Sequence, residues 1–581
     1  MFSILTKIRG GYRRLDSKYV KYVIFILCFI AVMAIQIAYL HPLEQPLIGH
    51  DSPYHYLRTE ALKKRIEDFD LLNGGVDYLF NNGAGYASYM AYPDILLFIP
   101  ALLRVCGFSM GTSMSLFLII CSVICYVLMF ICARKISESG TCGTIAAVIY
   151  SLSQYRIDNM FSRFAMGESL SFIFWPIIIY GLYDMAFDKF KKPYLLGIGI
   201  GGMLLTHSIS TALSLGLCVV VLLISLKRIS TDITLRKFFA RLGITALTTA
   251  LVTAFYWAPL LEFMSSCELT VSHPISIASN YVVEFFNLFR DIPVLYSEAG
   301  MGILMFALCL PRIMLCKKSP IRIDMQSEGD NHRHKLIVAM DTFMILGFII
   351  CLLATNIAPW KILAPILNFT QFPWRLFAMA STLIAIAAAV YVFIVAKHTN
   401  ALKTSMIAVT VLTVLFAGAH LKTIDPHYGY PMDDNYYQNS EVTFDVGYGE
   451  WLPWEAKTHF DDVKSLSDKL ILENGEQVPF ERNNGNLSFT VAESENTYAD
   501  IPYIWYKGYK ATDESDHELK TCMNDKGMLR VDISGVKGSI FVEYKLTVIK
   551  IISYTVSILT VIILGAILLF KKIRKKAIHQ V

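Results

Sequence analysis

The chain is poor in charged residues. Only 17% of its 581 residues are Asp, Glu, Lys or Arg, whereas soluble domains carry roughly 25%. Hydrophobic residues make up 55% of the chain, and apolar runs near the length of a bilayer crossing recur along most of it. The low charge excludes an ordinary soluble enzyme, and the repeated runs exclude a globular domain held by a single anchor. The sequence therefore predicts a polytopic membrane protein.

Several motifs of known binding sites are also missing. The chain has no phosphate-binding P-loop, no dinucleotide-binding glycine fingerprint, and no CxxC or Cys/His spacing of a metal site. Most of the 12 cysteines lie inside apolar runs, where cysteine behaves as a small apolar residue. The first apolar stretch, 20–40, is too long for the core of a signal peptide and lacks a small-residue cleavage site. We therefore expect no nucleotide site, no metal centre and no disulfide framework, and we expect 20–40 to remain as a span.

Hydropathy predicts about twelve membrane-spanning helices. Cytoplasmic loops collect Lys and Arg, and with about twelve spans every basic loop of this chain falls on one side of the membrane. Both termini are then expected in the cytoplasm of a multi-pass plasma-membrane protein. The predicted spans are 20–40, 111–133, 139–155, 168–186, 194–207, 209–226, 240–258, 299–316, 337–355, 374–396, 403–420 and 547–570.

Two long segments are predicted to lie outside the membrane. The first outer loop, 41–110, includes the apolar run 92–106, which is too short to span and is predicted to form an interfacial or re-entrant helix. The second is polar and contains alternating runs such as LSFTVAE and SIFVEYKLTV, which are typical of short strands. The predicted domains are a transmembrane domain over 1–420, an extracytoplasmic β-rich domain over 421–546, and a final span with a basic tail over 547–581.

The stretch 48–68, IGHDSPYHYLRTEALKKRIED, follows the first span and predicts a helix. Asp51 suits the N-cap and Pro53 suits the first turn. Steps of four and three residues place Asp51, His55 and Arg58 on one face. One interpretation is an ordinary capped helix on the membrane surface. In the other, ionised Asp51 accepts a proton from an alcohol, His55 orients a hydroxyl, and Arg58 meets a phosphate.

Four more candidates lie at the predicted outer mouths of spans: Arg163, Glu168, His207 and Arg375. For each of them, a purely structural role is the alternative to a role in binding or catalysis. Arg163 and Glu168 could form an ion pair, His207 could bind a headgroup or the backbone, and Arg375 could reach lipid phosphate. The spans themselves carry few charges, unlike those of a transporter with a midplane site. Any chemistry is therefore expected at the outer boundary of the membrane.

This layout resembles the GT-C superfamily, whose members are polytopic glycosyltransferases that take sugar from a polyprenyl-phosphate donor. The resemblance is carried by GHDSPYH after the first span, by AYPDILLFIPALLRVCG in the first outer loop, and by the basic end ICARKI of the next span. More closely, RFAMGESLSFIFWPIIIYGLY, LLTHSIST and AFYWAPLLE are similar to bacterial membrane proteins labelled 6-pyruvoyl-tetrahydropterin-synthase-related and to their YfhO-like relatives. The chain has no zinc-binding His triad, so pterin chemistry is not expected. The implied acidic site is one Asp rather than a pair, so no cofactor is expected, and a divalent metal stays an open alternative.

The resemblance implies inverting transfer of a sugar to a cell-surface glycan, polymer or protein acceptor. A general base deprotonates the acceptor hydroxyl, and cations stabilise the departing polyprenyl phosphate. Two other functions remain open: a transporter or flippase of lipid-linked glycans, and a non-catalytic membrane assembly protein. The bilayer is a partner in each case, and no nucleic acid is expected. The implied site consists of catalytic Asp51 and His55, donor phosphate-binding Arg58, Arg163, His207 and Arg375, and supporting Glu168.

Overall fold

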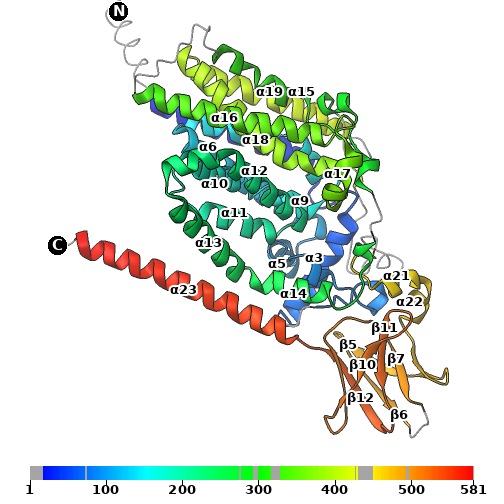
Figure 1. Cartoon of the computed structure of the whole chain (residues 1–581). Helices are drawn as coiled ribbons and strands as arrows, with labels where there is room; N and C mark the ends of the chain where they lie inside the picture. The colour runs from blue at the N-terminus through cyan, green and yellow to red at the C-terminus, as the bar shows by residue number, and fades with distance from the viewer. Residues whose placement is uncertain are drawn as a thin grey trace, which may run out of the picture.

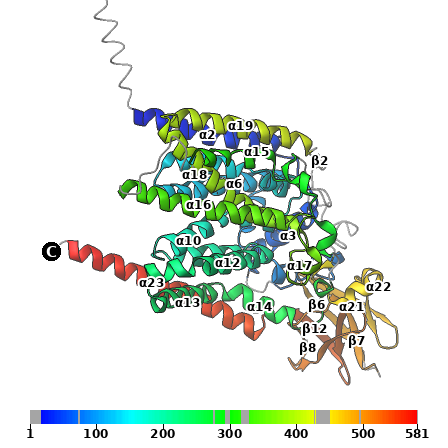
Figure 2. The same cartoon turned by 45° about the horizontal axis from the view of Figure 1, so that its top comes forward.

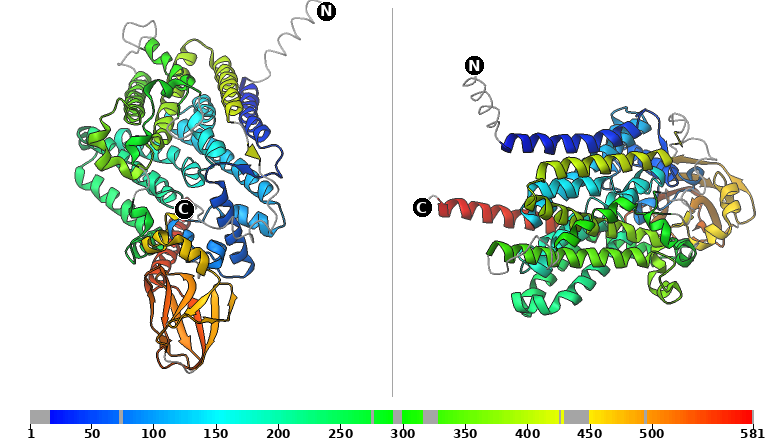
Figure 3. Two further views of the ribbon diagram at one scale, coloured as in Figure 1. Left: turned by 90° about the vertical axis from the view of Figure 1, so that its right-hand side faces the viewer. Right: turned by 90° about the horizontal axis from the view of Figure 1, so that it is seen from above.

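The computed structural model describes residues 17–71, 75–273, 277–291, 299–315, 328–424, 427–428, 449–492 and 496–579. A bundle of helices carries a smaller β-structure at one end (Figure 1). The first turns of helix α2 (Ser17–Tyr39) and the last turns of helix α23 (Val548–His579) lie at the other end of the bundle (Figures 2 and 3).

Seven of the described helices are long and apolar enough to cross a membrane, and a bent pair makes an eighth if it counts as one span. The bent pair is α13 (Leu235–Val252) and α14 (Ala254–Met264), which meet at 72°. The chain is therefore a polytopic helical membrane protein. Besides α2 and α23, the long helices are α6 (Met110–Ser137), α12 (Ser208–Asp232), α16 (Glu328–Leu353), α18 (Leu376–His398) and α19 (Leu402–Thr423).

The predicted count of about twelve spans is not confirmed. Four predicted spans contain only shorter helices, and at 1.5 Å per residue these do not reach across a hydrocarbon core of roughly 30 Å. Two of the four are almost wholly buried, so their apolar residues face protein rather than lipid. The shorter helices are α7 (Gly140–Ser151), α10 (Trp175–Phe187), α11 (Tyr194–Leu204) and α15 (Ile303–Ala307).

Helix α18 is the centre of the bundle. Of its most apolar window, 94% is buried inside the protein, against 11% for α23. Its sequence, LFAMASTLIAIAAAVYVFIVAKH, is rich in alanine, and small side chains let neighbouring helices approach closely. Arg375 directly precedes α18, so the packing of this helix fixes where that candidate residue lies.

The segment between α2 and α6, which the sequence predicts as the first outer loop, folds into short elements at the β-structure end. Strand β1 (Leu47–Ile48) pairs antiparallel with β2 (His427–Tyr428), so the loop is joined to the chain segment after α19. The predicted interfacial run contains a short helix whose Leu102 is 49% exposed and whose Arg104 is buried against Glu60. The elements of the loop are β1, α3 (Ser52–Glu67), η1 (Asn81–Gly83), α4 (Ser88–Ala91) and α5 (Phe98–Val105).

Short helices and turns complete the bundle. They are α8 (Gln154–Ile157), the π-helix η2 (Asp158–Ser162), α9 (Met166–Ser171), η3 (Thr270–Ser272), η4 (Ala278–Tyr281), η5 (Phe285–Phe289), η6 (Leu310–Leu315), α17 (Trp360–Leu367), η7 (Asn368–Thr370) and η8 (Pro373–Arg375).

The C-terminal β-structure consists of two five-stranded antiparallel sheets that follow two short helices, α21 (Trp454–Thr458) and α22 (Phe460–Leu466). Inward residues such as Ile501 and Ile540 are fully buried, as in a sandwich of two sheets. In the order of the hydrogen-bonded strands, one sheet is β10 (Thr521–Met523), β11 (Met528–Asp532), β7 (Tyr498–Ile504), β3 (Leu470–Leu472) and β4 (Gln477–Val478); the other is β5 (Phe480–Asn483), β6 (Asn486–Val491), β12 (Gly538–Tyr544), β8 (Tyr509–Asp513) and β9 (Glu518–Leu519).

The sandwich is joined to the first outer loop by hydrogen bonds. The Ile504 N–H donates to the Ala84 carbonyl at 2.8 Å, and the Trp451 N–H donates to the Tyr86 hydroxyl at 3.0 Å. The loop that follows the first span and the last domain of the chain therefore form one assembly beside the bundle.

Asp77 lies buried in this assembly, where Ser88 donates a hydrogen bond to its carboxylate. Burial raises the pKa of Asp77 from 3.8 to about 6, against the opposing effect of Arg65. The folded protein thus holds a proton that the unfolded chain releases, so stability falls as the pH rises from about 4 through 6. We expect Asp77→Asn to be more stable than the wild type by about 3 kcal/mol at pH 8, with the difference shrinking toward pH 4.

Thermal unfolding in detergent as a function of pH measures this difference. Asp461→Asn, at an exposed position, is the matched control and should show no such trend. An Asp77→Asn variant that is less stable than the wild type at pH 8 would contradict the prediction.

Candidate functional site

Asp51 occupies the N-cap position of α3, as the sequence predicts, but its side chain makes no capping hydrogen bond. Its backbone N–H donates to the Arg163 carbonyl at 2.9 Å, which joins the start of α3 to the segment after η2. The side chain is half-buried, and none of the described residues makes a hydrogen bond or ion pair with its carboxylate. The Asp51 carboxylate therefore lies at the start of α3 without capping the helix.

His55 is buried one turn further along α3, between two hydrogen-bond donors. Its Nε2 lies 3.3 Å from the Met166 N–H, and its Nδ1 lies 3.3 Å from an Arg58 nitrogen. Burial lowers the pKa of His55 well below its usual value, and Arg58 and His207 lower it further. The ring is therefore neutral, and it connects α3 to the start of α9.

Arg58 lies beside His55, and its positive charge is already balanced. Its guanidinium forms a buried ion pair with Asp94 and lies over the ring of Tyr92, 5.0 Å from the ring centroid. Asp94 comes from the predicted interfacial run, so this pair ties α3 to the outer loop. The helical periodicity predicts the face of α3 on which Arg58 lies. The predicted partner of Arg58 is a phosphate, whereas its partner in the structure is the carboxylate of Asp94.

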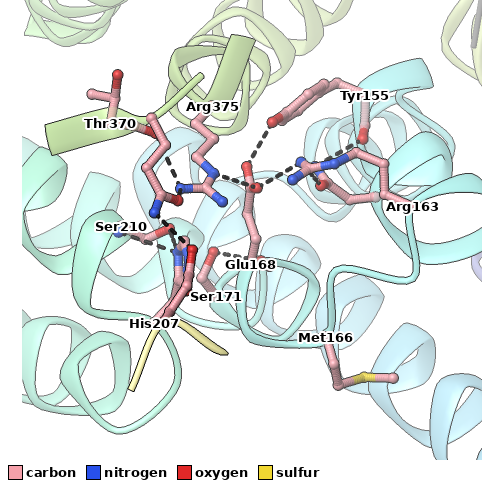
Figure 4. Close-up of polar contacts among 12 residues, drawn as sticks. Tyr155, Arg163, Met166, Glu168, Ser171, His207, Ser210, Thr370 and Arg375 are labelled. Carbon is pink, nitrogen blue, oxygen red and sulfur yellow. Dashed lines mark hydrogen bonds and ion pairs between the residues drawn. The ribbon is translucent and has the colours of Figure 1, made fainter. Parts of the chain in front are cut away.

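Glu168 is the centre of the densest polar cluster (Figure 4). Its carboxylate lies 3.0 Å from Arg163, accepts a hydrogen bond from the Tyr155 hydroxyl at 2.7 Å, and lies 3.6 Å from Arg375. The Arg163–Glu168 ion pair that the sequence suggested is present, and Arg375 joins it from the distant start of α18. Glu168 is only 2% exposed, so a single buried carboxylate faces two guanidinium groups.

Arg375 is positioned from its own side by two further contacts. It donates to the Thr370 carbonyl at 3.0 Å and to the Gln371 side-chain oxygen at 2.6 Å. Gln371 has a φ of +61°, a left-handed conformation that is uncommon for residues other than glycine. Its amide nitrogen donates to Glu450 at 3.2 Å, so the turn before α18 links Arg375 to the segment that enters the β-sandwich.

His207 caps the start of α12 with its ring. The Ser210 N–H donates to Nδ1 at 3.3 Å, so in the neutral ring the proton sits on Nε2. The charges of Arg375 and Arg163 both act on His207. A Cβ added at Gly167 would lie 3.3 Å from the His207 ring and 3.3 Å from Tyr92, so this glycine permits their close approach.

Glu450 is a residue of this site that the sequence analysis missed. It is half-buried, it accepts the hydrogen bond from Gln371, and burial raises its pKa. The charge of Arg375 lowers that pKa and the charge of Asp51 raises it, so Glu450 is electrostatically coupled to both. Its only signal in the sequence is an acid between aromatic residues, in GYGEWLPWE.

The structure thus brings together all seven predicted residues, but in two groups. Glu168, Arg163, Arg375 and His207 form one polar cluster, and Asp51 and Glu450 lie within electrostatic reach of its arginines. His55 and Arg58 follow Asp51 on α3 and pack against other segments. Two guanidinium groups with carboxylates nearby suit a ligand that has an anion at one end and hydroxyl groups at the other. Among the described residues, no group of three or more His, Cys, Asp or Glu side chains is placed to hold a metal ion.

Comparison with known proteins gives only distant matches. No family model matches the chain, so the nearer resemblance to the YfhO-like proteins is not confirmed. No curated protein matches it either.

Among solved structures, the chain is similar to the arabinofuranosyltransferase AftD from Mycobacteria, with 11% identity, a TM-score of 0.44, and coverage of 77% of this chain and 29% of that one. It is also similar to the Archaeoglobus fulgidus oligosaccharyltransferase, with 12% identity, a TM-score of 0.38, and coverage of 71% and 54%. A third match is ArnT from Cupriavidus metallidurans bound to undecaprenyl phosphate, with 12% identity, a TM-score of 0.36, and coverage of 79% and 82%. At these TM-scores the function has to be argued from the residues of the chain itself.

Proposed function

We propose that the protein is a glycosyltransferase that moves a sugar from a polyprenyl-phosphate donor to an acceptor hydroxyl, at the membrane surface that carries the β-sandwich. The observation that carries the proposal is the convergence of Arg163, His207 and Arg375, from three separate segments, close to the carboxylate of Asp51, which makes no hydrogen bond or ion pair with the described residues. Phosphate needs cations and donors that are already in place, and an acceptor hydroxyl needs a base within reach. Both requirements are met on one side of the bundle.

In the proposed reaction the acceptor oxygen attacks the anomeric carbon of the donor sugar while its proton passes to Asp51. The bond between that carbon and the phosphate oxygen breaks, and the electron pair leaves with the polyprenyl phosphate. Arg163 and Arg375 stabilise the charge that develops on the phosphate, and the Nε2–H of His207 donates a hydrogen bond to it. The configuration at the anomeric carbon is inverted in this single displacement.

The remaining site residues act on other residues rather than on the substrate. Glu168 fixes the two guanidinium groups relative to each other. His55 holds the start of α9 against α3. Arg58 holds the segment that contains Asp94 against α3 through their ion pair. His55 and Arg58 are thus positioning residues, in place of the roles that the sequence suggested, which were orienting a hydroxyl for His55 and binding a phosphate for Arg58.

Turnover is the test of the proposed function. The purified protein in nanodiscs is given a panel of undecaprenyl-phosphate-linked sugars, and transfer or release of the labelled sugar is followed. Turnover of one of them is the expected result. Tight binding of donors without any turnover would favour the transporter or assembly alternatives and would overturn the enzymatic proposal.

The phosphate role of Arg375 predicts a loss of affinity for undecaprenyl phosphate. A hydrogen bond to a charged group contributes about 1.5–3 kcal/mol, so Arg375→Gln is expected to weaken binding roughly tenfold to a hundredfold. The protein in nanodiscs is titrated with undecaprenyl phosphate, and its melting temperature is used to monitor binding. Arg236→Gln, at an exposed position in α13, removes the same charge and should bind as the wild type does. Equal affinities in all three proteins would remove Arg375 from the phosphate site.

A further inference from the structure

A pocket lies beside η2, where the lining residue His420 contacts Asp158. Two neighbouring residues of the π-helix connect the Glu168 cluster with this pocket. Asn159 accepts a hydrogen bond from Arg163 of the cluster at 2.7 Å, while Asp158 contacts His420 of α19, which lines the pocket. π-Helical turns are frequent at functional sites. None of the residues that line the pocket belongs to the site described above.

Most of the residues that line the pocket are apolar, and a smaller number are polar. The apolar part comes from the ends of α7, α15 and α19, and Figure 2 shows α15 and α19 side by side. The polar part includes His420 and Asp291. The apolar lining residues are Ile149, Leu152, Met301, Leu304, Met305, Leu308, Phe416 and Ala417.

His420 is held by Asp158 in a way that leaves one ring nitrogen facing no partner. Nε2 lies 2.6 Å from the Asp158 carboxylate, and the two side chains are 2% and 0% exposed. Nδ1 is buried and has no hydrogen-bond partner among the described residues. Buried polar atoms are nearly always satisfied, so the orphaned nitrogen of a residue that lines a pocket points to a ligand there.

Asp291 supplies a second acceptor beside His420. Its charge acts on the His420 ring, and it makes no ion pair with any described residue. Gly302, at φ +74°, faces it: a Cβ there would lie 2.9 Å from the Asp291 carboxylate. The glycine therefore keeps the space in front of this carboxylate open.

We propose that this pocket binds the head of a neutral lipid whose polar group is a hydroxyl. A hydroxyl can donate to a neutral Nδ1 or accept from a protonated one, so it satisfies His420 in either state. The same or a neighbouring hydroxyl donates to Asp291. A phosphate head would meet the like charge of Asp291, whereas acyl or prenyl chains would lie against the apolar lining from α15 and α19.

The probe is dioleoylglycerol, compared with dioleoyl-phosphatidic acid, in phosphatidylcholine nanodiscs. The two lipids have the same chains and differ in whether the head is a hydroxyl or a phosphate. Native mass spectrometry of the full-length protein is expected to show at least tenfold stronger retention of dioleoylglycerol. Equal retention of the two lipids, or equal occupancy by free glycerol, would overturn the assignment of a hydroxyl-headed lipid.

Three variants test whether the lipid binds in this pocket. Leu304→Trp fills it from its half-buried wall and is expected to reduce retention tenfold or more, while Leu412→Trp, at a 43% exposed position of α19, should leave it unchanged. Asp291→Asn removes one acceptor charge and should reduce the discrimination against phosphatidic acid. Retention that is unchanged in Leu304→Trp would overturn the proposal. Binding of undecaprenyl phosphate should be the same in Leu304→Trp and wild type, so this test is independent of the proposed transferase activity.

Discussion

Replacing Asp51 by asparagine is expected to lower sugar transfer by about 10²- to 10⁴-fold, the usual contribution of a general base. The asparagine keeps the shape of the side chain but cannot accept the proton of the acceptor hydroxyl. The fold should be unaffected, because the Asp51 side chain makes no capping hydrogen bond and its backbone contact with Arg163 is retained. Binding of undecaprenyl phosphate should therefore be the same as in the wild type, and the loss should be in kcat.

The matched control is Asp68→Asn, which makes the same change at the opposite, exposed end of α3. It should transfer sugar at the wild-type rate. Undiminished kcat in Asp51→Asn would remove Asp51 from the role of base. In that case Glu450 becomes the residue to replace next, because its carboxylate lies within electrostatic reach of Asp51 and Arg375.

Replacing Glu168 by alanine is expected to give the largest loss of stability at the site, about 3–5 kcal/mol. The change removes the one buried carboxylate that both Arg163 and Arg375 contact, at 3.0 and 3.6 Å. Two guanidinium groups would then repel each other in a buried place. Thermal unfolding of the purified protein measures the loss, and removal of one of the two charges in Glu168→Ala/Arg163→Met should recover part of it.

Glu268→Ala is the control for this loss. Glu268 also makes a close ion pair, 2.8 Å from His273, but its side chain is 57% exposed. Exposed pairs contribute about 1 kcal/mol or less, so this variant should unfold close to the wild type. A Glu168→Ala variant that loses no more stability than Glu268→Ala would show that the cluster carries no buried charge in need of compensation.

The composition and hydropathy of the chain predict its fold class, whereas the predicted number of spans is not confirmed in the described residues. Strands were expected in runs such as LSFTVAE and SIFVEYKLTV, where β6 and β12 are found. The apolar run 139–155 was expected to span, yet its helix α7 has 12 residues, nearly all buried inside the bundle. Hydropathy measures only how apolar a segment is, so it does not separate a helix that faces lipid from one that faces other helices.

For the site, periodicity predicts which side chains share a face but not what they contact. Asp51, His55 and Arg58 follow the predicted helical stripe, but the partners of the last two, Met166 and Asp94, come from other segments. Glu450 was not found because an acid between aromatic residues is a weak signal in the sequence. Its link to Arg375 runs through Gln371 and the left-handed backbone of that residue, which depend on tertiary packing.

The pairing of β1 with β2 has a consequence for how the protein is made. Leu47 and Tyr428 are partners about 380 positions apart, and ribosomes add roughly 5–20 residues per second. The strand just before Asp51 therefore waits roughly 20 to 80 seconds for its mate. In a nascent chain, Asp51 is therefore synthesised long before the strand that pairs with the segment in front of it, and β1 has no partner until about three quarters of the chain has been made.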